Sequence, residues 1–286
     1  MPEHPLVKYL RREALPTLFC PGCYNGIVMS ALLNALREMG VEDLRGFVFV
    51  SGIGCSSWIP SPHIKADSLH TLHGRAIAVA TGVKLVRPDL EVVVIAGDGD
   101  LASIGGNHLI HAARRNMDLL VVLVNNLVYA MTGGQHGPTT PLMLKTRTTP
   151  YGNPEPPADI AMLVSQTNAN YVARWCIAHF HQLKNSFIEA LKMRRGFRYI
   201  EVYAPCVTYV VRYEGKTPGQ KLKELAKQCI PLDRYLTLPM GERERYIAVG
   251  VFKREDKPGY IEMYREYIAR ARVEATARGV ERGASR

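Results

Sequence analysis

The sequence predicts an α/β protein built on a doubly wound, mostly parallel β-sheet. Short apolar runs rich in β-forming residues alternate along the chain with longer segments of helical periodicity. The runs are apolar throughout, as in strands that are buried on both faces. Strands and helices that alternate in this way form a parallel sheet covered by helices on both sides. In such sheets, ligands bind beyond the carboxyl ends of the strands, and we expect the functional residues there.

Each expected element follows from this alternation. The strands are predicted at residues 47–50, 91–96, 119–124, 171–173 and 199–202, and the helices at residues 27–39, 74–86, 105–115 and 179–193. Residues 132–157 are rich in Gly, Pro and Thr and lack periodicity, and a loop of that length is usually functional. The sheet pattern fades beyond residue 231. We therefore expect a cofactor-binding domain at residues 1–230 and a C-terminal arm at residues 231–286 that packs on the domain or on a partner subunit.

Composition and charge narrow the classes of function. Of the 286 residues, 47% are apolar, which is enough for a sizeable core. No run approaches the roughly 20 apolar residues that a membrane helix needs, and no signal peptide is evident, so we expect no membrane contact and a cytoplasmic location. The net charge of +10 can serve nucleic acid, an anionic substrate or an acidic protein. Much of it is interleaved with Glu between Arg265 and Arg286, as in a solvated helix, and no nucleic-acid-binding module is recognisable.

Two polar turns follow neighbouring strands. The strand at residues 91–96 runs into Gly-Asp98-Gly-Asp, and the strand at residues 119–124 ends at Asn-Asn126. A right-handed crossover places both strand ends at the same edge of the sheet, so a carboxylate and an amide oxygen converge. Such hard oxygen donors suit Mg²⁺ together with a diphosphate. Either turn alone would be an ordinary surface turn. Together they resemble the thiamine diphosphate signature, which implies Asp98, Asn126 and the backbone carbonyl of Val128 as the protein's ligands to Mg²⁺.

The six cysteines favour metal or redox chemistry in a reducing compartment. Cys20 and Cys23 form a CPGC pair that fits half a zinc site, a redox pair or two ligands of an iron–sulfur cluster. The other cysteines are single. Cys55 and Cys206 lie just past predicted strands, whereas Cys176 has the apolar setting of a core residue and Cys229 has no obvious role.

The order of these motifs resembles the β subunit of the 2-oxoacid:ferredoxin oxidoreductases over about residues 15–210. The motifs are CPGC, GIGCS, LHGRA, GDGD, NN and MTGGQ. The resemblance implies a [4Fe–4S] cluster held by Cys20, Cys23, Cys55 and Cys206. It also implies contacts to thiamine diphosphate from Ile53, Gly54, Cys55, Ser56, His73, Gly99, Asp100, Ala130 and Met131.

The sequence departs from the family pattern at two places. Tyr24-Asn25 stands where the family usually has Gly-His, which puts a hydrogen bond from that His in doubt. Gly133 stands where some members carry a Lys before the GQ of the glycine-rich loop, so the substrate carboxylate must be bound by another residue. Lys145 and Arg147, on the loop after the glycine motif, are candidates for the additional contact that a dicarboxylate substrate needs; the alternative is that both are solvated and that the partner subunit sets specificity.

By this resemblance the chain is an enzyme subunit that oxidatively decarboxylates a 2-oxoacid with coenzyme A, giving acyl-CoA and CO₂, and passes electrons through its cluster to ferredoxin. The segment 148–157 is similar to that of 2-oxoglutarate-using members; pyruvate or a broad substrate range is the alternative. The Glu that activates the cofactor has no place in this chain, so activity requires a partner α subunit in a hetero-oligomer. The rivals are a non-redox thiamine diphosphate decarboxylase or synthase subunit, and an electron-transfer or nucleic-acid-binding protein.

Overall fold

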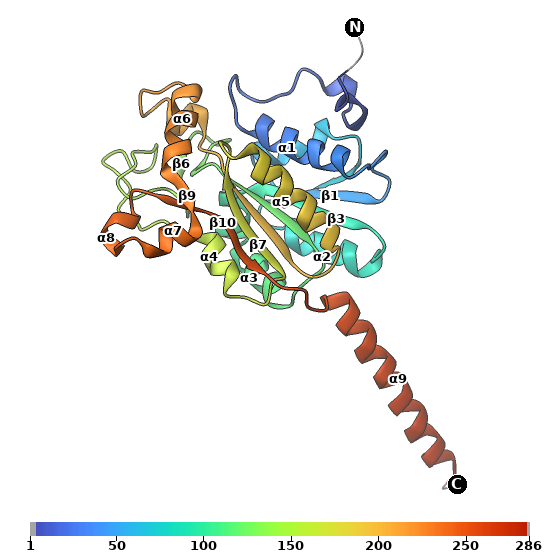
Figure 1. The fold of residues 1–286 in the computed structure, drawn as a ribbon. Coiled ribbons are helices and arrows are strands. Elements are labelled where there is room, and N and C mark those ends of the chain that lie inside the picture. Colours follow the sequence, from blue (N-terminus) through green and yellow to red (C-terminus); the bar gives the residue numbers. More distant parts are fainter. Residues whose placement is uncertain (1–3, 285–286) are drawn as a thin grey trace.

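The computed structural model describes residues 4–284, and side chains as far as residue 276. Its centre is an eight-stranded sheet in the order β2-β1-β3-β4-β8-β7-β10-β9 (Figure 1). All neighbouring strands in it run parallel except β10 and β7, which are antiparallel. The predicted mostly parallel α/β sheet is therefore confirmed. The strands are β1 Phe47–Ser51, β2 Asp67–His70, β3 Glu91–Gly97, β4 Leu120–Asn125, β7 Tyr171–Cys176, β8 Arg198–Tyr203, β9 Cys229–Pro231 and β10 Ile247–Arg254.

Helices cover both faces of the sheet because each central strand is apolar on both sides. In β3, Val93 and Ile95 pack into one core, which includes residues of α1 and α5, whereas Val92 and Val94 pack into a second core with residues of α2, α3 and α4. This alternation follows from the two-residue period of a strand. The helices are α1 Asn25–Glu38, α2 Ala76–Val86, α3 Gly106–Arg114, α4 Ile160–Ser165, α5 Phe180–Met193, α6 Pro218–Gln228, α7 Leu232–Thr237, α8 Met240–Arg243 and α9 Tyr260–Ala284.

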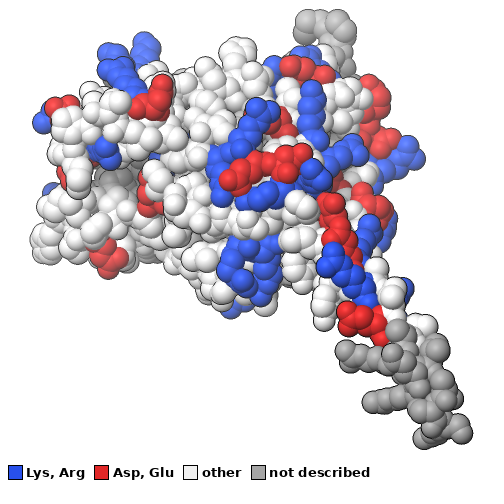
Figure 2. All heavy atoms as spheres, turned by 60° about the horizontal axis from the view of Figure 1, so that its bottom comes forward, with Lys and Arg blue, Asp and Glu red and all other residues white. Residues whose placement is uncertain are grey.

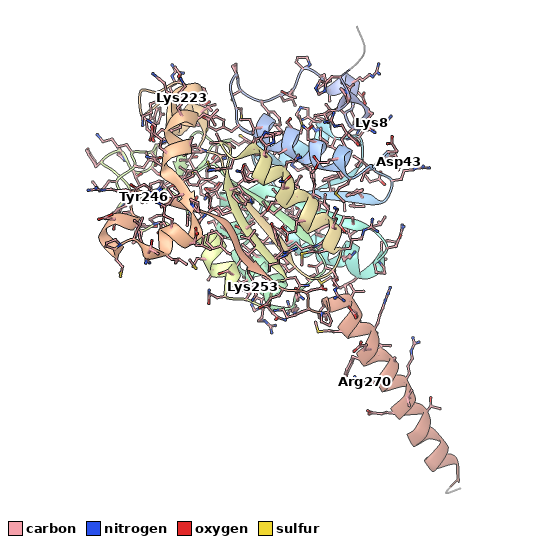
Figure 3. The ribbon with its side chains drawn as sticks, in the orientation of Figure 1. Lys8, Asp43, Lys223, Tyr246, Lys253 and Arg270 are labelled. Carbon is pink, nitrogen blue, oxygen red and sulfur yellow. The ribbon has the colours of Figure 1, made fainter. Side chains whose placement is uncertain are left out.

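The five predicted strands and four predicted helices are all present, with bounds shifted by one to three residues. The division into residues 1–230 and 231–286 stays a prediction, but the structure changes what the second part contains. The boundary falls inside β9, and β10 extends the main sheet, so the arm expected from residue 231 includes sheet strands. Tyr260 and Ile261 at the start of α9 pack on the domain, and the rest of the described helix stands clear of it; Figure 3 shows Arg270 on this exposed part.

The charged side chains of both signs are mixed rather than separated. On the face in Figure 2, Lys and Arg lie among Asp and Glu near the start of α9. Arg195 pairs with Asp256 at 2.7 Å, and Arg254 pairs with Glu189 at 2.6 Å. The side chains of α9 from Glu262 to Thr276 are nearly all exposed, and those of Arg278, Glu281, Arg282 and Arg286 lie outside the described residues. Among residues 4–284, no helix is long and apolar enough to cross a membrane.

Candidate active site

A pocket of about 260 Å³ lies at the carboxyl ends of β1, β3 and β4. Because these strands are parallel neighbours, the turns that follow them meet at one edge of the sheet. Every residue predicted to contact the cofactor or Mg²⁺ lines this pocket, and so do Gly97, Tyr129 and Thr132, which the sequence did not single out. A larger hollow of about 860 Å³ lies beside α5 and the end of β10, but it contains none of the predicted residues and is lined by acidic and basic side chains.

Asp98 is the most enclosed charged group of the pocket, with 1% of its surface exposed. Its Oδ2 accepts a hydrogen bond from Thr139 Oγ1 at 2.5 Å, and its Oδ1 accepts one from the backbone N–H of Asn126 at 3.4 Å. Burial raises the pKa of the Asp98 carboxyl to about 6, against the effect of these hydrogen bonds. A bound cation favours the charged form of such a carboxylate, so Asp98 is a fitting metal ligand.

Asn126 and Val128 belong to the turn that leaves β4. Leu127 between them has a φ of 73°, a left-handed conformation that makes the turn tight. The side-chain oxygen of Asn126 accepts a hydrogen bond from the Val128 N–H at 3.1 Å, which fixes the amide within the turn. Carboxylate, amide and carbonyl oxygens together are a donor set that suits Mg²⁺. In the described part of the chain, no group of three or more His, Cys, Asp or Glu side chains is arranged to hold a metal ion. The Asp–Asn pair is a different kind of site, since its second side chain is an amide.

Two other residues of the pocket lining carry buried polar atoms without partners. Asp100 Oδ1 accepts a hydrogen bond from the Gly74 N–H and lies 3.1 Å from His73 Nδ1, whereas Asp100 Oδ2 has no partner. Ser56 Oγ, also buried, has none. Such atoms are rarely left unpaired in a native protein. Both residues line the pocket, so a polar ligand bound there would lie close to two oxygen atoms that lack hydrogen-bond partners.

Two glycines permit this close packing. A Cβ atom at Gly52 would collide with the Asp100 carboxylate, and one at Gly99 would collide with the ring of Tyr129. Only glycine at these two positions lets the backbone after β1 and β3 pack so closely against the pocket wall. Such a backbone can also approach a diphosphate closely.

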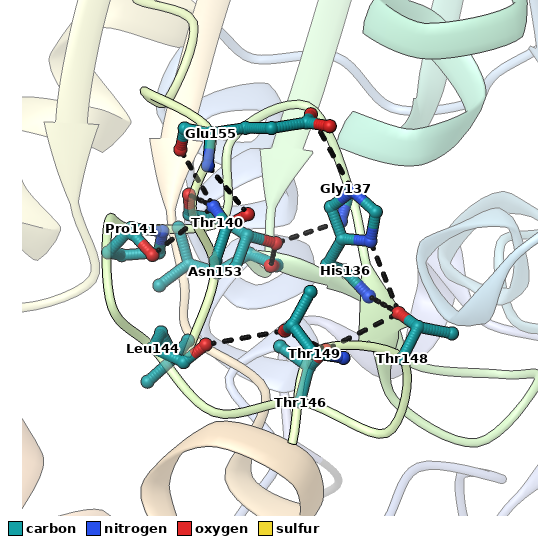
Figure 4. A network of polar contacts seen from close by, with 11 residues as sticks. His136, Gly137, Thr140, Pro141, Leu144, Thr146, Thr148, Thr149, Asn153 and Glu155 are labelled. Carbon is teal, nitrogen blue, oxygen red and sulfur yellow. Dashed lines mark hydrogen bonds and ion pairs between the residues drawn. The ribbon is translucent and has the colours of Figure 1, made fainter. Parts of the chain in front are cut away.

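The long loop 132–157 is ordered by its own polar contacts (Figure 4). The backbone N–H of His136 donates to Thr148 Oγ1 at 3.0 Å, and the buried Asn153 amide donates to the carbonyls of Thr140 and Glu155 at 2.9 and 2.8 Å. A short antiparallel pair, β5 Val128–Tyr129 and β6 Gln135–His136, joins the loop to the turn after β4. The loop thus delivers Thr139 to Asp98, a contact between residues far apart in the sequence that the motifs did not reveal.

The four cysteines predicted as cluster ligands line a second cavity, next to the first. Cys20, Cys23, Cys55 and Cys206 all face it, and Cys55, Asn126 and Ala130 line both cavities. Burial raises the pKa of the Cys23 thiol to about 11 and that of Cys55 to about 12. Cys206 follows β8, and its backbone N–H donates to the Asn126 carbonyl at 3.0 Å, which ties the cysteine to the turn after β4. These four cysteines thus line one cavity, and neither Cys176 nor Cys229 lines it. They are not arranged around a single metal ion, but each cysteine of a [4Fe–4S] cluster binds a different iron.

The two departures from the family pattern have structural explanations. The hydroxyl of the buried Tyr24 donates to the Pro218 carbonyl at 2.7 Å, so this side chain ties the start of α1 to α6, while Asn25 lines the cysteine cavity. At Gly133, a Cβ atom would lie 3.3 Å from the Arg147 Nη1. The guanidinium of Arg147 thus occupies space beside position 133 that a longer side chain there would need.

Comparisons with known proteins agree with this geometry. Residues 52–202 match the family described as thiamine pyrophosphate enzyme, C-terminal TPP binding domain. The chain is 44% identical to the 2-oxoglutarate synthase subunit KorB of Methanocaldococcus jannaschii, over 95% of this chain and 100% of that protein. It is 48% identical to the KorB subunit of Methanothermobacter marburgensis, over 90% of this chain and 89% of that one. The solved 2-oxoglutarate:ferredoxin oxidoreductase from Magnetococcus marinus, with 2-oxoglutarate, coenzyme A and succinyl-CoA bound, matches with a TM-score of 0.77 and 31% identity, over 95% of this chain and 92% of that chain.

Proposed function

The chain belongs to the β-subunit family of the 2-oxoacid:ferredoxin oxidoreductases, and from this membership we propose that it provides the thiamine diphosphate and cluster sites for the CoA-dependent oxidation of 2-oxoglutarate. The observation that carries the proposal is the meeting of two cavities at one sheet edge. One is lined by Asp98 and Asn126, the other by four cysteines, and Cys55 lines both. A carbon centre oxidised in the first cavity would lie beside an electron acceptor in the second.

In the first cavity, we assign Mg²⁺ to Asp98, to the Asn126 side chain and to the Val128 carbonyl. When bound, thiamine diphosphate supplies the nucleophilic carbon and the electron sink that allow a 2-oxoacid to lose CO₂. This chain's part is to hold the diphosphate through the metal and to line the pocket with Ile53, Gly54, Ser56, His73, Gly99, Asp100, Ala130 and Met131. The subunit names of the relatives imply a hetero-oligomer, and we propose that the partner supplies the Glu that activates the cofactor.

In the second cavity, we assign a [4Fe–4S] cluster to Cys20, Cys23, Cys55 and Cys206. Thiol groups with raised pKa values bind protons strongly, so ligation to iron, which requires thiolates, would release those protons. The cluster would pass electrons to a ferredoxin. A non-redox thiamine diphosphate subunit would have no need for this set of cysteines beside the pocket.

For the substrate, 2-oxoglutarate differs from pyruvate by a second carboxylate, which needs a cationic partner. Arg147 is placed to provide it. Its backbone N–H donates to the Gly134 carbonyl at 3.0 Å and its guanidinium lies against Gly133, next to Thr132 of the pocket lining. Lys145 and Arg147 are both exposed, but Arg147 is the one whose guanidinium packs beside Gly133 of the glycine-rich loop. We therefore assign the distal carboxylate to Arg147 rather than to Lys145.

The experiment compares kcat/KM for 2-oxoglutarate and pyruvate in the complex of this chain with its partner subunit. The unmodified complex should prefer 2-oxoglutarate, and a tenfold or greater preference for pyruvate, about 1.4 kcal/mol, contradicts the substrate assignment. In Arg147→Ala, the loss of a charge-assisted hydrogen bond should lower kcat/KM for 2-oxoglutarate about 10-fold to 100-fold and leave pyruvate nearly unchanged. Lys145→Ala is the matched control. An equal loss for both substrates in Arg147→Ala would show that Arg147 does not bind the distal carboxylate.

A further inference from the structure

A second group of sulfur atoms lies apart from both cavities. Cys176 is the last residue of β7, and Cys229 lies where α6 passes into β9. Their exposed fractions are 0% and 4%, and neither lines the thiamine diphosphate pocket or the cysteine cavity. In the sequence, Cys176 has the setting of a core residue and Cys229 has no obvious role. Their surroundings, however, are those of a reactive pair.

The two cysteines converge on one carbonyl group. The backbone N–H of Cys229 donates to the Leu225 carbonyl at the end of α6, and Cys176 Sγ lies 4.0 Å from the same oxygen. Each of the two thiols shifts the pKa of the other, as neighbouring thiols do. Cys176 Sγ also lies 3.2 Å from Nδ1 of His179, which is half-buried at the start of α5. A sheet strand and a helix end therefore hold two sulfur atoms and an imidazole together.

The chemistry of the trio is that of an activated thiol. Hydrogen bonds from Cys229 and then from His179 lower the pKa of the Cys176 thiol to about 5, and Cys176 in turn raises the pKa of the His179 imidazole. Cys229 shows the opposite shift, because its bond to Cys176 and its burial raise its pKa. The shifts favour the thiolate form of Cys176 beside the protonated form of His179, and they favour the protonated form of Cys229.

A route from the solvent lies beside the trio. A groove of about 490 Å³ is lined by Ile177 and Ala178, between the reactive Cys and His, and by Leu222 and Ala226, on either side of Leu225. Lys223, visible on α6 in Figure 3, is also part of its lining. Cys176 itself is fully buried, but the residue that follows it in the chain, Ile177, lines this groove.

We propose that Cys176 and Cys229 form a redox-active dithiol, in which Cys176 reacts with a hydroperoxide and Cys229 closes a disulfide. In the first step, the Cys176 sulfur forms a bond to one peroxide oxygen, the O–O bond breaks, and the leaving hydroxide takes the proton held by His179. In the second, Cys229 loses its proton and attacks the sulfenic sulfur, so an S–S bond forms as the S–O bond breaks and a second water leaves. Two thiols lose two electrons, and one hydrogen peroxide becomes two waters.

The test maps the disulfide directly, so damage to an iron–sulfur cluster does not affect the result. The anaerobically purified complex is treated with hydrogen peroxide, free thiols are alkylated, and the non-reduced protein is digested with trypsin. Cleavage after Arg174 and Lys184 releases Cys176, and cleavage after Lys227 and Arg234 releases Cys229 on a different peptide. We expect a disulfide-linked pair of peptides whose mass is two hydrogens lower than the sum of the two free-thiol peptides. Oxidation of exposed methionines shows that the peroxide treatment was effective. If both cysteine peptides are then recovered as alkylated thiols, the proposal is overturned.

Three variants separate the roles within the pair. Cys229→Ser should leave a sulfenic acid on Cys176 that dimedone traps, and Cys176→Ser should leave Cys229 as an unreacted thiol. His179→Gln should slow Cys176 oxidation about tenfold. In this variant the oxidation rate should rise with pH, as it does for an ordinary thiol, whereas in the unmodified chain the rate of Cys176 oxidation should be nearly constant above about pH 6. A purely structural role for the trio predicts no dimedone adduct in Cys229→Ser and no change in pH profile in His179→Gln, and either result contradicts the proposal.

Discussion

Replacing Thr139 by valine tests whether the long loop supports the metal site. Thr139 is buried, with 4% of its surface exposed, and its hydroxyl lies 2.5 Å from Asp98 Oδ2 and 2.8 Å from Asn125 Oδ1. A hydroxyl has one proton to donate, and the carboxylate is the stronger acceptor. Valine has nearly the same shape, so Thr139→Val removes this hydrogen bond without opening a cavity.

The loss of metal affinity expected in Thr139→Val can be estimated in two independent ways. A hydrogen bond to a charged group contributes about 1.5–3 kcal/mol. Removing a residue that orients a metal ligand lowers metal affinity about 10–100-fold, which corresponds to about 1.4–2.7 kcal/mol. The two ranges agree. We therefore expect Thr139→Val to bind Mg²⁺ and thiamine diphosphate 10-fold to 100-fold more weakly, since Asp98 loses the group that fixes its second oxygen.

The assay is a Mg²⁺ titration of the cofactor-free complex at fixed thiamine diphosphate, with bound thiamine measured after rapid filtration. Thr139→Ser keeps the hydroxyl and is the matched control, which should bind nearly as the unmodified chain does. Thermal unfolding without cofactor shows whether each variant is folded. Normal affinity in Thr139→Val, or an equal loss in Thr139→Ser, would refute the role that we give to this hydroxyl.

The other predictions concern the metal, the cluster and the electron acceptor. Asp98→Ala or Asn126→Ala should abolish thiamine diphosphate retention and leave the fold intact; unchanged thiamine content in either purified variant contradicts the metal assignment. Cys206→Ser should lose or destabilise the cluster absorption, whereas Cys176→Ser should keep it; an intact spectrum in Cys206→Ser shows that the fourth ligand lies elsewhere. Because the net charge is +10, the rate of reduction of an acidic ferredoxin should fall as salt is added, and a salt-independent rate would argue against electrostatic docking.

The central part of the fold could be predicted from the sequence because its strands are apolar throughout. β3 and β4 are buried along their length, and no loop resembles them in composition. Two of the strands that were missed are not buried along their length. β2, Asp67–His70, is polar and mostly exposed at the sheet edge, and β10, Ile247–Arg254, is only partly buried from Gly250 onward and ends in Lys253 and Arg254. Their pairing depends on the neighbouring strand rather than on their own composition, so periodicity alone could not find them.

The candidate site could be predicted where it depends on local sequence. Asp98 and Asn126 each follow a strand, and parallel topology then places them together. Thr139 could not be found in this way, and the sequence could not distinguish Arg147 from Lys145. Their roles depend on how a loop without regular structure folds back on the strand ends, and that path is fixed by tertiary hydrogen bonds such as those of Asn153. The contact between Cys176 and the Leu225 carbonyl, to which the Cys229 N–H also donates, is likewise a product of packing between β7 and α6.

The cofactor content of the native complex tests the central claim most directly. The complex is purified anaerobically with its partner subunit, and thiamine diphosphate, magnesium, iron and acid-labile sulfide are measured per copy of this chain. We predict about one thiamine diphosphate and one Mg²⁺, together with at least four iron and four sulfide that fall by about four each in Cys206→Ser. A complex that is active with 2-oxoglutarate but holds no thiamine diphosphate, or whose iron content does not change in Cys206→Ser, would contradict the account.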